Sequence, residues 1–274
     1  MCNAGFFLSA VWLSKARKMG SSPCSRLHLK LHISARAGVR PSTMEQLGLH
    51  LSSMAEEEDL HEAGRIGPES KVLVALAKAL RTLHASPVPP ELEAFLKEVG
   101  DVGWGGPHLA KWLSYAEEKG YNRLPLLPGL RDLIAELEAI AGPLGPNTFC
   151  HFDLLADNLV LKKDGSILLV DFEYSAPGQP FMDLAVLAMG CSLTAEEERS
   201  LLSAYLGKEL AESDHYRFKA VRVLAALRET FWGVTAELSQ SSALTAEEAI
   251  AYADMNFGKF TSLREEFRSL VPPS

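Results

Sequence analysis

Cysteine is scarce in this sequence of 274 residues, which contains only Cys2, Cys24, Cys150 and Cys191. The four cysteines form no CxxC pair and do not have the spacing of a metal-binding motif. We therefore expect reduced thiols in a cytosol-like compartment, and cytoplasmic localisation is the first expectation.

Long hydrophobic runs are lacking as well. The apolar run at residues 6–13 is too short to span a bilayer, and its positive charges follow it, whereas those of a secretory signal come first. An apolar content of 47% and a mean hydropathy of +0.03 are typical of a soluble globular chain. These features predict no membrane partner.

Acidic residues are missing from residues 1–44, which carry seven Lys and Arg residues. This composition resembles an organellar transit peptide, but a poorly ordered tail or translated sequence upstream of the true start would look the same. The net charge of the whole chain is -8, which argues against a nucleic-acid partner.

Helical periodicity dominates after residue 69, without an internal repeat or a coiled-coil heptad. Apolar residues recur at spacings of three and four from Ser70 to His84, and Pro87 ends the pattern. Further helices are expected at 92–99, 109–119, 130–141, 184–191, 195–206, 216–238 and 246–267, with a glycine-rich loop at 100–107. Thr194 with Glu197, and Thr245 with Glu248, fit capping boxes.

One β-hairpin interrupts the helical pattern. Two β-rich runs, at 158–161 and 167–170, flank the turn Lys163-Asp164-Gly165-Ser166. The sequence therefore predicts an α+β chain that is mostly helical and has one small hairpin.

Polar residues cluster around that hairpin. Asp153 and Asn158 lie five residues apart in a loop, and Asp171 follows the second strand, so the hairpin brings the three together. A carboxylate that accepts a hydroxyl proton, with an amide and a carboxylate as oxygen ligands of Mg²⁺, is the equipment of phosphoryl transfer. We expect His151 to support the loop by bonding its backbone, and Asp183 to brace it. Taken singly, loop Asp and Asn residues are usually turn formers.

These residues carry a family resemblance. HFDLLADNLVL at 151–161, with ILLVDFEYSAPGQPFMDLAVLA at 167–188, resembles the catalytic core of the choline/ethanolamine kinase and aminoglycoside phosphotransferase superfamily, which has a protein-kinase-like fold. The DFEY variant at 171–174 resembles choline kinases. LAKALRTLH at 76–84 is similar to the helix that opens the C-terminal lobe of that family, and LRETFWG at 227–233 to the helix that lines its choline pocket. The resemblance covers about residues 70–268. It implies a kinase-like C-terminal catalytic lobe over residues 69–274, which follows a poorly defined leader, or remnant of the N-terminal lobe, over residues 1–68.

The resemblance implies the site residues and the co-substrate. Asp153 would be the catalytic base, Asn158 and Asp171 the Mg²⁺ ligands, and Glu173 a ligand of a second metal ion. ATP would supply the phosphoryl group.

The resemblance also implies an acceptor pocket, in which Tyr174 and Trp232 would be walls for a quaternary ammonium group. Simple core packing is the alternative for both rings.

The chain departs from the family pattern in several places. Phe152 stands where the family usually has a small or polar residue, Asp157 where Gly or Ala is common, and Thr235 where choline kinases often have an aromatic residue. The family's N-terminal lobe takes about a hundred residues before the helix at 72–85, but only about seventy precede it here, without a Gly-rich loop. Lys30 is the sole lysine in a strand-like alternation.

The function predicted is an ATP- and Mg²⁺-dependent kinase that acts on a small hydroxylated amine such as choline or ethanolamine. An aminoglycoside or sugar kinase is the alternative within enzymes, and a truncated, inactive kinase-like binding module is the alternative outside them. The nucleotide-binding residues and the oligomeric state are not predicted.

Overall fold

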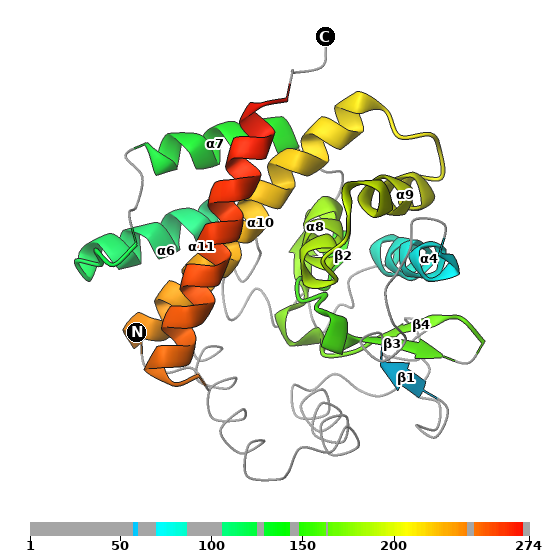
Figure 1. Ribbon diagram of the computed structural model, residues 1–274, viewed down its shortest axis with the longest axis horizontal. Helices are drawn as coiled ribbons and strands as arrows, with labels where there is room; N and C mark the ends of the chain where they lie inside the picture. The colour runs from blue at the N-terminus through cyan, green and yellow to red at the C-terminus, as the bar shows by residue number, and fades with distance from the viewer. Residues whose placement is uncertain are drawn as a thin grey trace. The chain divides into compact units, whose positions relative to one another are not determined.

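The computed structural model describes residues 57–59, 70–86, 106–124, 129–142, 148–162, 164–239 and 244–270 (Figure 1). These residues form two compact units whose segments alternate along the chain. The hairpin unit comprises the described residues of 57–86 and 148–215. The helical unit comprises those of 106–142 and 216–270.

Two small antiparallel sheets organise the hairpin unit. The first has the order β1-β3-β4, formed by Glu57–Asp59, Leu159–Lys162 and Ile167–Leu169. The second pairs β2, Thr148–Cys150, with β5, Ala176–Gly178. Short 3₁₀ turns, η2 at Ala156–Asn158 and η3 at Phe172–Tyr174, precede β3 and β5.

The predicted hairpin is confirmed as the β3–β4 pair, with Val160 opposite Leu168. Gly165 has a φ of 79°, a left-handed conformation that glycine adopts without a steric penalty, and its N–H donates to the Lys162 carbonyl at 2.8 Å. Strand β1 was not predicted, because three residues are too short for a periodic pattern. It places β3 in the middle of its sheet.

Three helices complete the hairpin unit: α4 (Lys71–Ala85), α8 (Pro180–Gly190) and α9 (Ala195–Leu206). The Ser70 side chain caps α4 by accepting the Val72 N–H at 3.1 Å, and α4 packs against α9 (Figure 1). The predicted capping box of Thr194 and Glu197 is confirmed at the start of α9.

Helix α8 begins earlier than the predicted residue 184. Pro180 is its first residue, and the Gln179 side chain caps it by accepting the Phe181 N–H at 2.9 Å. Asp183 therefore lies inside the first turn of α8, where an acidic side chain is favourable. Residues 181–188 are all buried, so the helix is apolar on every side except at Asp183.

Four helices form the helical unit: α6 (Gly106–Glu118), α7 (Leu130–Ala141), α10 (Glu212–Ser239) and α11 (Ala246–Arg268). The first four residues of α10, Glu212–His215, belong to the hairpin unit. Helices α10 and α11 approach closely at Gly233, where a Cβ would lie 2.8 Å from the Ala253 nitrogen.

The predicted helices agree with these bounds to within four residues, and the capping box at Thr245 and Glu248 is confirmed. Gly106 and Pro107 were expected in a loop but begin α6, because proline is compatible with a first helical turn. The expected helix at 92–99, the leader 1–44 with Lys30, and residues 100–105 lie outside the described residues. None of the described helices is both long and apolar enough to cross a bilayer.

Candidate active site

The loop between β2 and β3 brings Asp153 and Asn158 into direct contact. The Asn158 Nδ2 group donates to the Asp153 carboxylate Oδ2 at 2.8 Å and to the Asp153 backbone carbonyl at 2.7 Å. Asn158 is buried and Asp153 is half-buried. The spacing of five residues seen in the sequence is therefore the span of one closed loop, which is held by the amide of its last residue.

Asp171 is tied to the same loop through the residue before it. The Val170 N–H donates to the Asn158 carbonyl at 3.0 Å, and Leu159 is opposite Leu169 in the β3–β4 ladder. Asp171 is half-buried and has a φ of 68°, a left-handed conformation that Asp adopts more readily than most residues. The hairpin thus returns the backbone at Asp171 to the loop.

His151 lies buried beneath the loop and bonds backbone at two points. Its Nδ1 accepts the Asp153 N–H at 3.3 Å, and its Nε2 lies 2.9 Å from the Val170 carbonyl, to which it donates in that tautomer. The ring also packs against Phe172, with 4.5 Å between the centroids. His151 therefore connects the two ends of the hairpin that carry Asp153 and Asp171.

Asp183 holds the start of the loop from α8. Its Oδ2 accepts the His151 N–H at 2.7 Å, and its Oδ1 accepts the Phe152 N–H at 2.7 Å. The Asp183 side chain is 0% exposed. A buried carboxylate needs such donors, because desolvation of an unpartnered charge costs several kcal/mol. Asp183 thus fixes the backbone of the two residues that precede Asp153.

The aromatic residue in this segment adopts an unusual backbone conformation. Phe152 has a φ of 64°, which is rare for a bulky residue, and it is fully buried. Strained residues of this kind persist where their surroundings hold them, often at functional sites. Phe152 and Asp171 are two of the three non-glycine residues with positive φ in the part of the chain that the structure describes.

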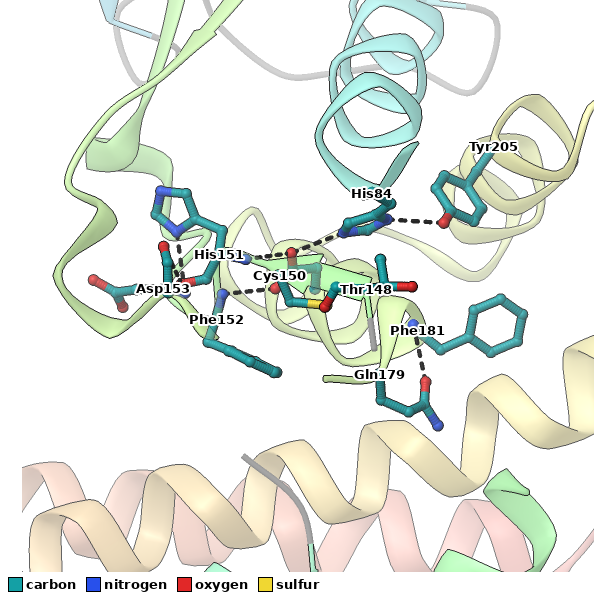
Figure 2. A network of polar contacts seen from close by, with 11 residues as sticks. His84, Thr148, Cys150, His151, Phe152, Asp153, Gln179, Phe181 and Tyr205 are labelled. Carbon is teal, nitrogen blue, oxygen red and sulfur yellow. Dashed lines mark hydrogen bonds and ion pairs between the residues drawn. The ribbon is translucent and has the colours of Figure 1, made fainter. Parts of the chain in front are cut away.

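Three further residues around Asp183 were not among the predicted site residues. His84, at the end of α4, lies with its Nε2 2.9 Å from Asp183 Oδ2 and its Nδ1 2.8 Å from the Tyr205 hydroxyl of α9 (Figure 2). Cys150 is buried beside them, and both burial and the Asp183 charge raise the pKa of its thiol. No local pattern could have shown the first contact, because 99 residues separate His84 from Asp183.

The ligand atoms of His84, Cys150 and Asp183 all lie within 4.8 Å of one another. This spacing alone would suit a metal ion. In this structure the cluster forms a hydrogen-bond network, in which Asp183 Oδ2 contacts both His84 Nε2 and the His151 N–H.

The residues expected to bind the acceptor lie in different units. Tyr174 is half-buried in η3 of the hairpin unit, and Trp232 is half-buried in α10 of the helical unit. Trp232 packs edge-on against Tyr252, with 5.1 Å between centroids, and the Tyr252 hydroxyl donates to the Glu229 carboxylate. The Glu173 and Asp157 side chains lie outside the described part of the structure, so their predicted positions are untested.

Solved structures that resemble this chain include choline and ethanolamine kinases. A choline/ethanolamine kinase family protein from Mesorhizobium loti is 23% identical, with a TM-score of 0.58 over 82% of this chain and 76% of that one. An ethanolamine kinase from Plasmodium vivax is 22% identical, with a TM-score of 0.57 over 74% of this chain and 62% of that one. The choline kinase from Streptococcus pneumoniae is 19% identical, with a TM-score of 0.56 over 82% and 78%.

At these identities the likeness shows the fold. The mostly helical C-terminal lobe of a kinase-like fold, with its small β-hairpin, is confirmed. A search of curated proteins returns no significant match.

The family itself follows from a comparison with family models. The model of the phosphotransferase enzyme family (APH) matches residues 40–229, which is more than half of the chain and includes the whole β2–α8 segment. The superfamily suggested by the sequence is thereby confirmed. The chain belongs to the phosphotransferase enzyme family.

Proposed function

We propose that this protein transfers the γ-phosphoryl group of ATP to the hydroxyl of a small hydroxylated amine, such as choline or ethanolamine. The observation that carries the proposal is the closed Asp153–Asn158 loop, with Asp171 tied to it through Val170. In-line phosphoryl transfer depends mainly on positioning and on charge stabilisation, and this loop is a positioning device.

Asp153 is the base in this mechanism. Its Oδ2 accepts the Asn158 amide, which fixes the plane of the carboxylate. As the acceptor oxygen attacks the γ-phosphorus, its proton passes to the Asp153 carboxylate. The bond from the γ-phosphorus to the bridging oxygen breaks, and ADP leaves. The half-buried position of Asp153 is consistent with this role, because an acceptor must reach it from solvent.

The donor set suits Mg²⁺. Asn158 and Asp171 offer hard oxygen atoms, which Mg²⁺ prefers. Because Asn158 Nδ2 donates to the Asp153 carboxylate, the Asn158 amide oxygen points away from Asp153. Asn158 and Asp171 would hold the ion, with Glu173 as the ligand of a second one. When bound, Mg²⁺ neutralises negative charge on the phosphates.

The amine end of the acceptor is assigned to aromatic residues. Trp232 and Tyr252 present rings at 68° to each other, and the Glu229 carboxylate is bonded to Tyr252. Aromatic faces attract quaternary ammonium groups. The Glu229 carboxylate is itself paired with Arg228 Nη1 at 3.2 Å. On the basis of the family resemblance, Tyr174 of the hairpin unit is also proposed as an acceptor-binding residue.

The test is turnover of the purified chain with ATP and Mg²⁺ over a panel of acceptors. Choline and ethanolamine should yield ADP, and Asp153→Ala should not. If the protein prefers an aminoglycoside or a sugar, the acceptor is not a small hydroxylated amine. The absence of both turnover and an ATP-dependent thermal shift would favour the inactive binding module.

A further inference from the structure

The hydroxyl of Thr235, in α10 of the helical unit, is buried and has no hydrogen-bond partner in the part of the chain that the structure describes. A threonine inside a helix can donate its hydroxyl to the carbonyl four residues earlier. Every other threonine inside a described helix does so: Thr82 to Lys78 at 2.9 Å, Thr230 to Ala226 at 2.8 Å, and Thr261 to Phe257 at 2.9 Å. Thr235 is therefore an exception even within its own helix.

Thr235 lies next to the aromatic residues that are proposed to bind the amine. It follows Trp232 by three residues, and side chains with this spacing are neighbours on a helix surface, with about 5–6 Å between their Cβ atoms. Trp232 packs edge-on against Tyr252 of α11, with 5.1 Å between the centroids. The two helices are close at this level, since a Cβ on Gly233 would lie 2.8 Å from the Ala253 nitrogen.

The other polar groups near the two rings already have partners. The Tyr252 hydroxyl donates to Glu229 Oε2, and Arg228 Nη1 lies 3.2 Å from Glu229 Oε1. Both oxygen atoms of Glu229 are therefore engaged, and its charge is paired with a guanidinium. Among these side chains, Thr235 offers the oxygen atom that has no partner.

A buried hydroxyl without a partner is unfavourable, so a bound molecule that supplies the partner gains affinity. At neutral pH a primary, secondary or tertiary amine carries at least one ammonium N–H, which can donate to a hydroxyl oxygen. A quaternary ammonium group has no N–H, although aromatic rings attract both kinds of cation. The only donor of choline is the hydroxyl that would take the phosphoryl group. An amine with an N–H can therefore satisfy Thr235 at its cationic end, and choline cannot.

We propose that Thr235 is a specificity-determining residue. Its hydroxyl oxygen accepts an N–H of the acceptor's ammonium group, so the protein prefers amino alcohols that carry such an N–H over quaternary ones. The inference rests on the proposed function for the reaction that follows, but binding of the amine tests it without turnover.

The experiment uses ethanolamine, N-methylethanolamine, N,N-dimethylethanolamine and choline, whose ammonium groups carry three, two, one and no N–H. For each amine, kcat/KM with ATP and Mg²⁺ is measured together with the Kd from calorimetric titration. Thr235→Val keeps the shape of the side chain and removes the hydroxyl, and Thr235→Ser keeps the hydroxyl. Thr230→Val in the same helix is the matched control, because the Thr230 hydroxyl is already bonded to the Ala226 carbonyl. Thermal midpoints show that each variant is folded.

We expect kcat/KM in wild type to differ by less than about 3-fold among the three amines that carry an N–H. Choline should be used at least about 10-fold less efficiently than N,N-dimethylethanolamine, because only the last methyl group removes the final N–H. This step should shrink below about 2-fold in Thr235→Val and should persist in Thr235→Ser and Thr230→Val. The Kd values should show the same step.

Three results would overturn the inference: equal use of choline and N,N-dimethylethanolamine by wild type, a gradual change with each methyl group, or a step that survives in Thr235→Val. Failure of the proposed function has a different signature, because no amine would then be phosphorylated. In that case the Kd values decide: a step at the last methyl group that Thr235→Val removes supports the inference, and the absence of binding by all four amines overturns it.

Discussion

The ring of Phe152 lies directly over Gly178. A Cβ on Gly178 would lie 2.2 Å from the Cζ atom of Phe152, closer than any real contact. Phe152 is therefore held in its left-handed conformation by two features: the Asp183 carboxylate, which binds its N–H, and the space above Gly178, which receives its ring. The Phe152 ring can occupy this position because residue 178 of β5 is a glycine.

Gly178→Ala should lower the free energy of unfolding by about 1–3 kcal/mol, since the methyl group forces the Phe152 ring to move. Denaturant unfolding measures the loss. Gly258→Ala in α11 is the matched control, because nothing lies within 4 Å of its Cβ position and alanine favours a helix. In the Phe152→Leu background, Gly178→Ala should lower the free energy of unfolding by less than it does in wild type. Equal losses of unfolding free energy in the two backgrounds would show that the Phe152 ring and Gly178 are not coupled.

Asp183→Asn should destabilise the chain by about 1–3 kcal/mol and should lower kcat further than it lowers stability. An amide offers one acceptor where the carboxylate serves two backbone N–H groups, so a buried N–H loses its partner. Unfolding and steady-state kinetics measure the two effects. Asp132→Asn, at an exposed position in α7, is the control, and a similar effect of both variants would contradict the assigned role.

Asp171→Asn should keep the fold but weaken Mg²⁺-dependent binding of ATP. Asparagine tolerates the left-handed conformation of Asp171, whereas alanine adds strain, so only the charge changes. Calorimetric titration with ATP, with and without Mg²⁺, measures the binding. Unchanged Mg²⁺-dependent affinity at an unchanged thermal midpoint would remove Asp171 from the metal site.

Glu138→Gln should raise the thermal midpoint near pH 7, and the gain should vanish below about pH 4. Burial raises the pKa of Glu138, and its buried Oε1 has no hydrogen-bond partner among the described residues. Below the ordinary pKa, the Glu138 carboxyl is protonated in both folded and unfolded chains, so its ionisation does not lower the stability of the folded state. As the pH rises through the raised pKa, the folded state loses stability relative to the unfolded one. Thermal melts across this range, with the exposed Glu136→Gln as control, should show the difference only at position 138.

Trp232→Ala should weaken binding of a quaternary amine by ~0.5–2 kcal/mol, because a cation–π contact is lost. Trp232→Phe keeps an aromatic face and should retain part of the affinity. Titration with choline measures both variants. If neither changes the affinity, the acceptor does not contact this face of α10.

Local patterns were sufficient for most of the secondary structure and for the polar loop. The helix at 130–141 matches α7 at both ends, because a glycine precedes and follows its apolar stripe. The Asp-Gly turn predicted the hairpin, and a hairpin brings the backbone at Asp171 back beside Asn158. The start of α8 was placed too late, because a capping glutamine is a weaker sequence signal than Ser, Thr or Asp.

The surroundings of the loop could not be predicted in the same way. His84 and Tyr205 meet 121 residues apart in sequence, and the role of Gly178 depends on where the Phe152 ring lies in space. The catalytic role of Asp153 stays a prediction, as do the metal-binding roles of Asn158, Asp171 and Glu173 and the acceptor-binding roles of Tyr174 and Trp232. The boundary at residues 68 and 69 and the cytoplasmic location also stay predictions.

In the proposed reaction, the carboxylate of Asp153 takes the acceptor's proton during phosphoryl transfer. Phosphorus NMR of ATP, Mg²⁺ and choline or ethanolamine, with wild type and with Asp153→Asn at matched concentration, measures the contribution of that carboxylate. We predict a phosphomonoester signal with wild type and a rate at least about 100-fold lower with Asp153→Asn, whose thermal midpoint should stay close to that of wild type. A phosphomonoester formed equally fast by both proteins, or by neither, would contradict the claim.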